Sequence, residues 1–150
     1  ENVLRNALNH LDGYDLIIID TPPSLSLLTV NALAASDFVI IPTLPQAADL
    51  RGLSLIINTI DEIKQAINPS LAILGVLITQ FDGRLIHHSE ALDVLESWDL
   101  PIFETRIGRT VKAAESAGVG RPLVDYEPGN KRAVEYQELA KEVISWLKRQ

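Results

Sequence analysis

The chain has 150 residues, of which 47% are hydrophobic, and this is enough to form the buried core of one domain. Its net charge of −7 and its lack of cysteine exclude a disulfide framework, thiolate metal sites and a strongly basic nucleic-acid-binding domain, but not a small basic patch. No apolar run reaches the length of a membrane span and no basic segment precedes an apolar one at the start, so we expect no membrane helix and no signal peptide.

Apolar periodicity predicts helices that alternate with buried strands. The first helix is expected over residues 2–11, because its apolar side chains have helical spacing and Gly13 follows as a helix-stop residue. Continuous apolar runs predict strands that are covered on both faces, as in a parallel sheet. These strands are expected at residues 16–19, 38–41, 71–78 and 101–107.

Two longer apolar stripes predict helices over residues 47–67 and 132–148, and Asn68-Pro69 ends the first of them. The repetition of strand, helix and strand predicts an α/β fold with a doubly wound, mostly parallel sheet. Because we find no internal repeat, low-complexity tract or linker, we expect residues 1–150 to belong to a single domain.

The end of the first predicted strand carries a carboxylate at a position typical of ligand sites. Asp20 follows the apolar residues 16–19 and precedes a Thr-Pro-Pro turn. Ligands of open α/β sheets bind at the carboxyl ends of the strands. A carboxylate there can hold a water of a phosphate-bound Mg²⁺, because magnesium keeps several of its waters. The alternative is a turn aspartate that only caps a buried strand.

The run from Asp20 to Asp37, followed by Phe38-Val-Ile-Ile-Pro42, resembles the Walker B and switch II region of the ParA/MinD family of ATPases. Within that family the chain is most similar to the ParA (Soj) partitioning branch. The resemblance continues in the family's order over essentially the whole chain, through Gly52-Leu53, 73–79, 81–84, 105–112, Glu115, 120–126 and 140–143.

This resemblance implies a P-loop NTPase fold with ATP and Mg²⁺ as cofactors. It also implies a homodimer that binds DNA without sequence preference, is driven to hydrolyse ATP by a ParB-like partner, and segregates chromosome or plasmid DNA. Such a protein is cytoplasmic and associated with the nucleoid. No membrane partner is expected.

The family's phosphate-binding loop, the deviant Walker A motif, has no match in the chain, since no GKT or GKS loop is present. The chain therefore resembles the carboxyl-terminal part of such an ATPase, truncated on the amino-terminal side. A phosphate loop supplies the backbone N–H groups and the lysine that hold the phosphates. We expect the parent protein to be an ATPase, and the 150 residues alone to lack catalytic residues and to bind ATP and Mg²⁺ weakly or not at all.

The resemblance assigns nucleotide-binding roles to two kinds of residue, those near the phosphates and those near the adenine. Asp20 would hold Mg²⁺ through water. The complete set of expected cofactor-binding residues is Asp20, Thr21, Pro22, Thr79, Gln80, Ile107, Gly108 and Arg109. Gly108 stands where the family commonly has proline, so the loop around it is less rigidly preset.

Pro22 and Pro23 have two interpretations. Two prolines fix φ and remove two N–H donors, which makes a rigid exit from a strand. The resemblance implies instead a switch loop that senses the γ-phosphate and a helix beginning near Leu25 that transmits its state.

Arg84 and Lys112 are the expected DNA-binding residues. Arg84 lies in Phe-Asp-Gly-Arg, where the family usually has Asp-x-Arg, and Lys112 ends Ile-Gly-Arg-Thr-Val-Lys, where the family has Ile-Pro-Arg and a second basic residue. Neutralisation of phosphates needs positive charges spaced over a surface and no base reading. The alternative for each is a solvated surface charge. Further cations could extend the patch: Arg106, Arg109, Arg121, Lys131 and Arg132.

Two other functions remain open. A MinD-like regulator would end in a basic amphipathic helix that lies on lipid, but the polar face of the last predicted helix mixes Glu135, Glu138 and Glu142 with basic residues. A non-catalytic binding module is the other. His87 and His88 are adjacent and would point to different helix faces, so we expect surface imidazoles and no histidine metal site.

Overall fold

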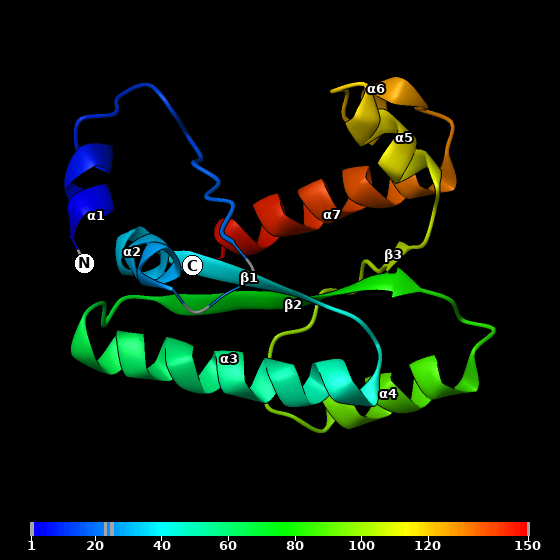
Figure 1. The fold of residues 1–150 in the computed structure, drawn as a ribbon, viewed down its shortest axis with the longest axis horizontal. Helices are drawn as coiled ribbons and strands as arrows, with labels where there is room; N and C mark the ends of the chain where they lie inside the picture. Colours follow the sequence, from blue (N-terminus) through cyan, green and yellow to red (C-terminus); the bar gives the residue numbers. More distant parts are fainter. Residues whose placement is uncertain (1, 23, 25, 150) are drawn as a thin grey trace. The chain divides into compact units, whose positions relative to one another are not determined.

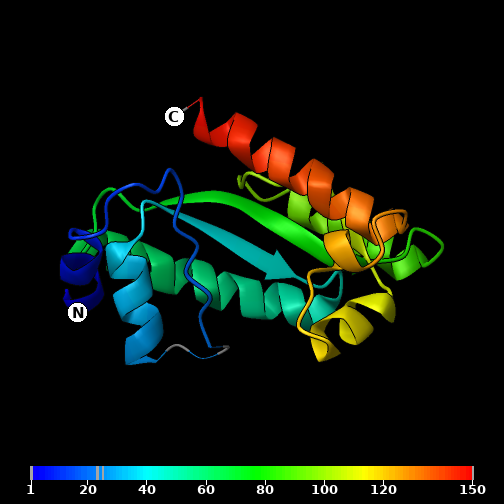
Figure 2. The same ribbon diagram turned by 90° about the horizontal axis from the view of Figure 1, so that it is seen from above.

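The computed structural model describes residues 2–22, 24 and 26–149, and Figures 1 and 2 show its fold from two sides. Pro23 and Leu25 of the expected switch segment lie outside the described residues. The chain divides into two compact units, of which the first contains Glu1–Val39 and Ser54–Ala72 and the second contains Ile40–Leu53 and Ile73–Gln150. The assignment of residues 1–150 to one domain stays a prediction.

Helices and strands alternate through the middle of the chain, as the apolar periodicity predicts, whereas consecutive helices occupy both ends. In order they are α1 Val3–Leu8, α2 Leu27–Ala35, β1 Phe38–Thr43, α3 Ala47–Ala66, β2 Ala72–Phe81, α4 Ile86–Glu96, β3 Ile107–Gly108, α5 Lys112–Gly118, α6 Leu123–Tyr126 and α7 Lys131–Leu147.

The strands form one sheet in the order β1-β2-β3. β2 pairs with β3 in parallel, with Thr79 opposite Ile107 and Phe81 opposite Gly108, and β1 runs in the same direction as β2 (Figure 2). An isolated parallel bridge joins Val76 to Ile102 upstream of β3. The predicted α/β fold with a parallel sheet is confirmed.

In the second unit, β2 supplies the centre of the core and is covered on both faces. α7 lies on one face of the sheet and α4 on the other (Figure 1). Leu95 of α4 and Val76 of β2 are fully buried. On the α7 side, the ring of Phe103 stacks on Trp146 with 4.5 Å between ring centroids. Gly75 permits this packing, because a Cβ at that position would lie 2.6 Å from the Phe103 ring.

In the first unit, α1 packs against α2, and the Arg5 side chain donates a hydrogen bond to the carbonyl of Ala34. Asn68 follows α3 and is 2% exposed. Its amide group donates to the carbonyls of Leu33 at 3.0 Å and Ser36 at 2.7 Å. The residue expected only to end a helix therefore also satisfies the carboxyl end of α2.

The predicted strand at residues 16–19 is wrong for this chain. These residues have no regular structure, and the side chains of Leu16, Ile17 and Ile18 are 52%, 43% and 85% exposed. A strand is stabilised by hydrogen bonds to a neighbour. None of the strands in the described part of the chain pairs with residues 16–19. These residues therefore lack the neighbouring strand that would stabilise them as a strand.

The strand predicted at residues 101–107 forms only in part. It is reduced to the bridge at Ile102 and to β3, because the N–H groups of Glu104 and Thr105 donate to the carboxylate of Glu142 instead of to a strand. The first helix is also shorter than predicted, since α1 ends at Leu8. The helix expected near Leu25 begins at Leu27.

The other long elements agree closely with the predictions. β1, β2, α3 and α7 each begin and end within three residues of the expected bounds. Over the described residues, no helix combines the length and the apolar character that crossing a bilayer requires.

Candidate functional site

A cavity of about 320 Å³ lies in the second unit, where β2 and β3 end. Its lining comes from the ends of both strands, the start of α5 and the first turns of α7. The lining residues are Thr79, Gln80, Ile107, Gly108, Arg109, Thr110, Ala113, Arg132 and Tyr136. Thus five of the eight expected cofactor-binding residues come together in one pocket. Its position agrees with the general location of ligand sites in parallel sheets.

Gln80 shapes one side of the pocket through its backbone. It is the extra residue between the pairs Thr79–Ile107 and Phe81–Gly108, and its φ is 53°. Left-handed φ is uncommon for residues other than glycine, and a bulge changes the direction of a strand end. The neighbouring Thr79 hydroxyl donates to the carbonyl of Thr43 at 3.2 Å, which ties the end of β2 to the end of β1.

Gly108 lies in another wall of the pocket, and side chains of α7 contact it. Its N–H donates to Glu135 Oε2 at 2.8 Å, and Glu135 in turn forms an ion pair with Arg132. The Arg132 and Glu135 side chains are only 24% and 19% exposed. A Cβ on Gly108 would overlap the guanidinium of Arg132, so any side chain at position 108 would displace the guanidinium.

Asp20, Thr21 and Pro22 belong to the first unit and form no part of the pocket in the second. All three are exposed. The described residues contain no cluster of three or more acidic or histidine side chains that could bind a metal. A lone exposed carboxylate fits a magnesium ion that keeps most of its waters, and does not fit an all-protein cation cage.

Arg84 lies on the turn between β2 and α4, and its side chain is 89% exposed. Asp82 Oδ1 accepts from the Arg84 backbone N–H at 3.1 Å and from Nε at 2.9 Å, and Oδ2 accepts from Nη2 at 2.6 Å. The hydrogen bonds from the Arg84 side chain and backbone hold the pKa of Asp82 well below its usual range. The expected DNA-binding arginine is therefore paired within its own turn.

His88 supports the same turn from α4. Its Nδ1 accepts from the backbone N–H of Asp82 at 3.1 Å, and its ring lies 6.0 Å from that of Phe81. At 5% exposure it is buried, so the expectation of a surface imidazole is wrong for His88. The apolar face of α4 turns inward and buries the imidazole, a placement that two adjacent histidines do not reveal in the sequence.

Lys112 begins α5, and its Nζ donates to Glu115 Oε2 at 2.8 Å. This hydrogen bond raises the pKa of Lys112. Such exposed pairs are weak and exchange readily with other charges, so both expected DNA-binding cations can still meet a phosphate.

The cations proposed to extend the patch differ in their surroundings. The Arg106 guanidinium lies over the Phe81 ring, 5.1 Å from its centroid, and Arg132 is engaged with Glu135. These two are half-buried. The other three are exposed, and of these Arg121 donates to the carbonyl of Asp125 at 2.9 Å. They are Arg109, Arg121 and Lys131.

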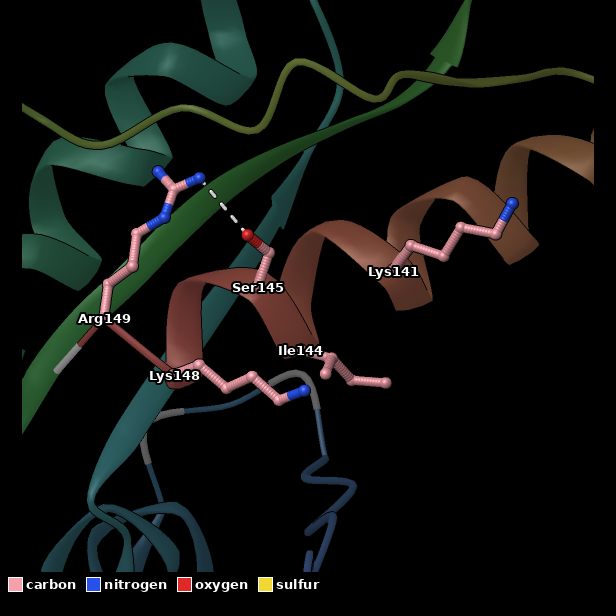
Figure 3. A pocket seen from close by; sticks show the side chains of 5 residues that line it. All are labelled: Lys141, Ile144, Ser145, Lys148 and Arg149. Carbon is pink, nitrogen blue, oxygen red and sulfur yellow. Dashed lines mark hydrogen bonds between the residues drawn. The ribbon is translucent and has the colours of Figure 1, made fainter.

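A second hollow, of about 540 Å³, lies at the carboxyl end of α7 (Figure 3). It is lined by Lys141, Ile144, Ser145, Lys148 and Arg149. Arg149 Nη2 donates to Ser145 Oγ at 3.2 Å. The sequence does not predict this basic end, because its pattern places the glutamates and the basic residues of the helix on one mixed polar face. In the structure Glu142 binds the backbone N–H groups of Glu104 and Thr105, and Glu135 binds that of Gly108.

Sequence reasoning also missed residues of the pocket wall. The sequence indicates a surface patch for Arg132 and gives Tyr136 no site role, and it places Glu135, which binds Gly108, on a mixed polar face. The spacing of Arg132, Glu135 and Tyr136 does indicate one helix face. Nothing in that spacing identifies β3 as the element that this face contacts.

Comparisons with known proteins identify relatives of the chain. A family model described as an AAA domain matches residues 1–73. The chromosome partitioning protein ParA of Myxococcus xanthus is 42% identical over 94% of this chain and 50% of its own length. The chromosome-partitioning ATPase Soj of Thermus thermophilus is 37% identical over 95% of this chain and 57% of its own. The chain thus spans about half the length of these relatives.

Solved structures share the fold. The cobyrinic acid a,c-diamide synthase of Mycobacterium smegmatis, with bound ADP and magnesium, is 35% identical with a TM-score of 0.78, over 97% of this chain and 53% of that one. The septum site-determining protein MinD of Pyrococcus horikoshii, in complex with Mg-ADP, is 27% identical with a TM-score of 0.69, over 93% and 54%.

Proposed function

We propose that this chain, which belongs to the ParA/Soj-type family of ATPases, forms the base-binding and DNA-binding part of a DNA-partitioning ATPase. The observation that carries this proposal is the pocket at the ends of β2 and β3, where Thr79, Gln80 and residues 107–109 meet. Its volume of about 320 Å³ lies within the usual range of small-molecule sites, about 300–1,000 Å³.

In this proposal the pocket takes the base of ATP and Asp20 holds Mg²⁺ through water. The solved relatives with ADP and magnesium support a nucleotide and this metal. The phosphates need a Gly-rich loop with lysine, which the 150 residues lack. Hydrolysis is therefore a property of the complete protein, and this chain alone is inactive.

The role of Asp20 is tested in the complete protein by Asp20→Ala. Phosphoryl transfer depends on charge stabilisation by the metal, so turnover should fall by at least about a hundredfold. Asp12→Ala, which removes another exposed carboxylate of the first unit, is the control and should keep its activity. Normal turnover with an unchanged Mg²⁺ requirement in Asp20→Ala would show that Asp20 does not hold the metal.

DNA binding is the second part of the proposal. Arg84 follows β2 and Lys112 begins α5, so both cations are presented by turns on the surface of one unit. A homodimer formed around ATP would double the number of phosphates that they meet. A ParB-like partner would stimulate hydrolysis and release the DNA, and the protein would then be found at the nucleoid.

The test is Arg84→Glu combined with Lys112→Glu in the complete protein with ATP. DNA affinity should fall about tenfold or more at low salt, because contacts to phosphates are lost. The dependence of the affinity on salt should also weaken, by about one unit of slope for each lost contact. Nucleotide affinity should not change. The control is Lys64→Glu, the same charge reversal at an exposed position on α3. Unchanged DNA binding in the double variant would refute the assignment.

A second candidate function is favoured by one observation, the basic end of α7. Lys141, Lys148 and Arg149 surround Ile144, which is 49% exposed, and this combination suits an anionic lipid surface. The measurement is sedimentation of the complete protein with phosphatidylglycerol vesicles, with phosphatidylcholine vesicles as the control. A MinD-like role would be favoured if the complete protein binds these vesicles and does not bind DNA. The double variant Lys148→Glu with Arg149→Glu should then lose the lipid binding.

A further inference from the structure

We propose that Glu135 and Arg132 are positioning residues that hold residues 107–109 in the shape needed to bind the nucleotide base. This role rests on the proposed function of the pocket. The two residues lie one helical turn apart near the start of α7, and they act on Gly108 in different ways. Glu135 binds its N–H group, and Arg132 covers its Cα.

The backbone N–H groups of Glu104, Thr105 and Gly108 have their acceptors on α7. β3 contains only Ile107 and Gly108, so residues 104–106 lie outside the strand. Glu142 accepts from Glu104 N at 2.8 Å and from Thr105 N at 3.0 Å, and Glu135 accepts from Gly108 N at 2.8 Å. Carboxylates are strong acceptors of such bonds. Two glutamates of α7 therefore hold the backbone of residues 104–108 in addition to the pairing of β3 with β2.

The spacing of the two elements makes this possible. Glu135 and Glu142 are separated by two turns of helix, which is about 10 Å at about 1.5 Å per residue. The three to four residues between their partners span about 10–13 Å in extended conformation. The two glutamates thus meet their partners along one antiparallel line, and Glu135 is the one bound to Gly108, which lines the pocket.

Arg132 fills the space beside Gly108. The Arg132 guanidinium lies where a Cβ of residue 108 would be, and its ion pair with Glu135 keeps it there. The helix start fixes Arg132 further, because its backbone N–H donates to Asn130 Oδ1 at 2.9 Å and Asn130 donates to Glu127 at 3.0 Å. Since Arg132 also lines the pocket, its position sets one wall.

Gly108 therefore has a structural role that a proline could not take. Proline has no N–H to donate to Glu135, and its ring would occupy the space of the guanidinium. In this chain a polar clamp from α7 holds the pocket wall, and a rigid residue at position 108 is not needed for that. The consequence is that nucleotide affinity depends on side chains of α7 as well as on residues 107–109 themselves.

The first experiment replaces Glu135 in the complete protein. In Glu135→Ala the Kd for ATP with Mg²⁺, measured by calorimetry, should rise about tenfold, as expected for losing a charge-assisted hydrogen bond. Amide exchange at Gly108 should become faster in the nucleotide-free protein. Glu135→Gln keeps an acceptor and should restore most of both. Glu138→Ala, one turn along and paired only with Lys141 among the residues described, is the control.

The outcomes separate the two proposals. Faster exchange at Gly108 with unchanged ATP affinity would overturn the positioning role while leaving the pocket assignment intact. A complete wild-type protein that binds no ATP would overturn the proposed function, and the positioning role with it. An effect of Glu138→Ala equal to that of Glu135→Ala would also overturn the positioning role, because a general effect on α7 would then explain both.

The second experiment tests the contact between Gly108 and Arg132 as a double-mutant cycle. Gly108→Ala should weaken ATP binding by about fivefold or more in the wild-type background, since the methyl group displaces the guanidinium. In the Arg132→Ala background the same change should have less than about a twofold effect, because the space is then free. Equal effects in the two backgrounds would show that Arg132 does not set the shape around Gly108.

Discussion

A single side chain, Asn68, satisfies both the carboxyl end of α2 and the turn after α3. Its amide donates to two carbonyls, and its Oδ1 accepts from the Ser70 hydroxyl at 2.8 Å. Buried acceptors that lose their donor destabilise a protein by about 1–3 kcal/mol each. Asn68→Ala should therefore lower the free energy of unfolding by about 2–4 kcal/mol.

Denaturant unfolding of the two variants checks this prediction. Asn58→Ala, at an exposed position in the middle of α3, is the control and should change stability by less than about 0.5 kcal/mol. If both variants shift the midpoint equally, the bonds of Asn68 contribute no more than a helix surface residue does.

Asp82 pairs with Arg84, the arginine proposed to bind DNA phosphates. The carboxylate competes for the guanidinium, and exposed pairs of this kind are worth little, so Asp82→Asn should strengthen DNA binding of the complete protein by up to about fivefold. Salt titrations of DNA affinity would show the change. An Asp82→Asn protein that binds DNA more weakly would indicate that Asp82 is needed to orient Arg84.

The same pair predicts a pH dependence. Its contribution to stability is fully present above the ordinary pKa of aspartate, about 3.9, because the folded pKa of Asp82 is lowered. It is lost only as the pH falls through that lower folded value. Unfolding measurements on the wild type and Asp82→Asn should therefore differ by a constant amount between about pH 5 and 8. A difference that changes within this interval would assign the effect to another group.

At the scale of elements, residues 16–19 have the composition of a buried strand but not its surroundings. The chain spans about half the length of its ParA and Soj relatives. We predict that in the complete protein another strand pairs with residues 16–19 and that their amides are protected from hydrogen exchange by at least about a hundredfold more than in the 150-residue chain. Equal exchange in the two proteins would contradict this prediction.

α7 makes two kinds of contact with the rest of its unit, apolar packing and hydrogen bonds from carboxylates. Trp146 packs on Phe103 near the end of the helix, while Glu142 and Glu135 hold the backbone of the segment that leads to β3. The apolar contacts fix the helix on the sheet, and the carboxylates then fix the strand relative to the helix. The pocket lies at the end of this series of contacts.

At the scale of the whole molecule, the 150 residues contain a pocket at the ends of β2 and β3 but no phosphate loop. In nucleotide sites the phosphates contribute much of the affinity through backbone N–H groups. Calorimetry should give a Kd for ATP with Mg²⁺ of about 1 mM or weaker, against micromolar values for ordinary nucleotide sites. Micromolar binding by this chain would show that its own residues hold the phosphates.

The sequence by itself determined the features that depend on local order. The strands β1 and β2 and the helices α3 and α7 follow from apolar runs and stripes, because burial of such patterns has few alternatives. Residues 79–80 and 107–109 are named as nucleotide-binding residues by the resemblance to the family, and the structure brings them together because the carboxyl ends of parallel strands meet at one edge.

Only the tertiary structure decided which side chains complete the pocket and which elements form at all. Residues 16–19 carry a strand pattern yet remain exposed, because strand formation depends on a partner that a local pattern does not contain. Arg132 and Glu135 look like surface charges in sequence. Arg132 becomes part of the pocket wall and Glu135 holds Gly108 there, because α7 lies on residues 104–108 and accepts from the N–H groups of Glu104, Thr105 and Gly108.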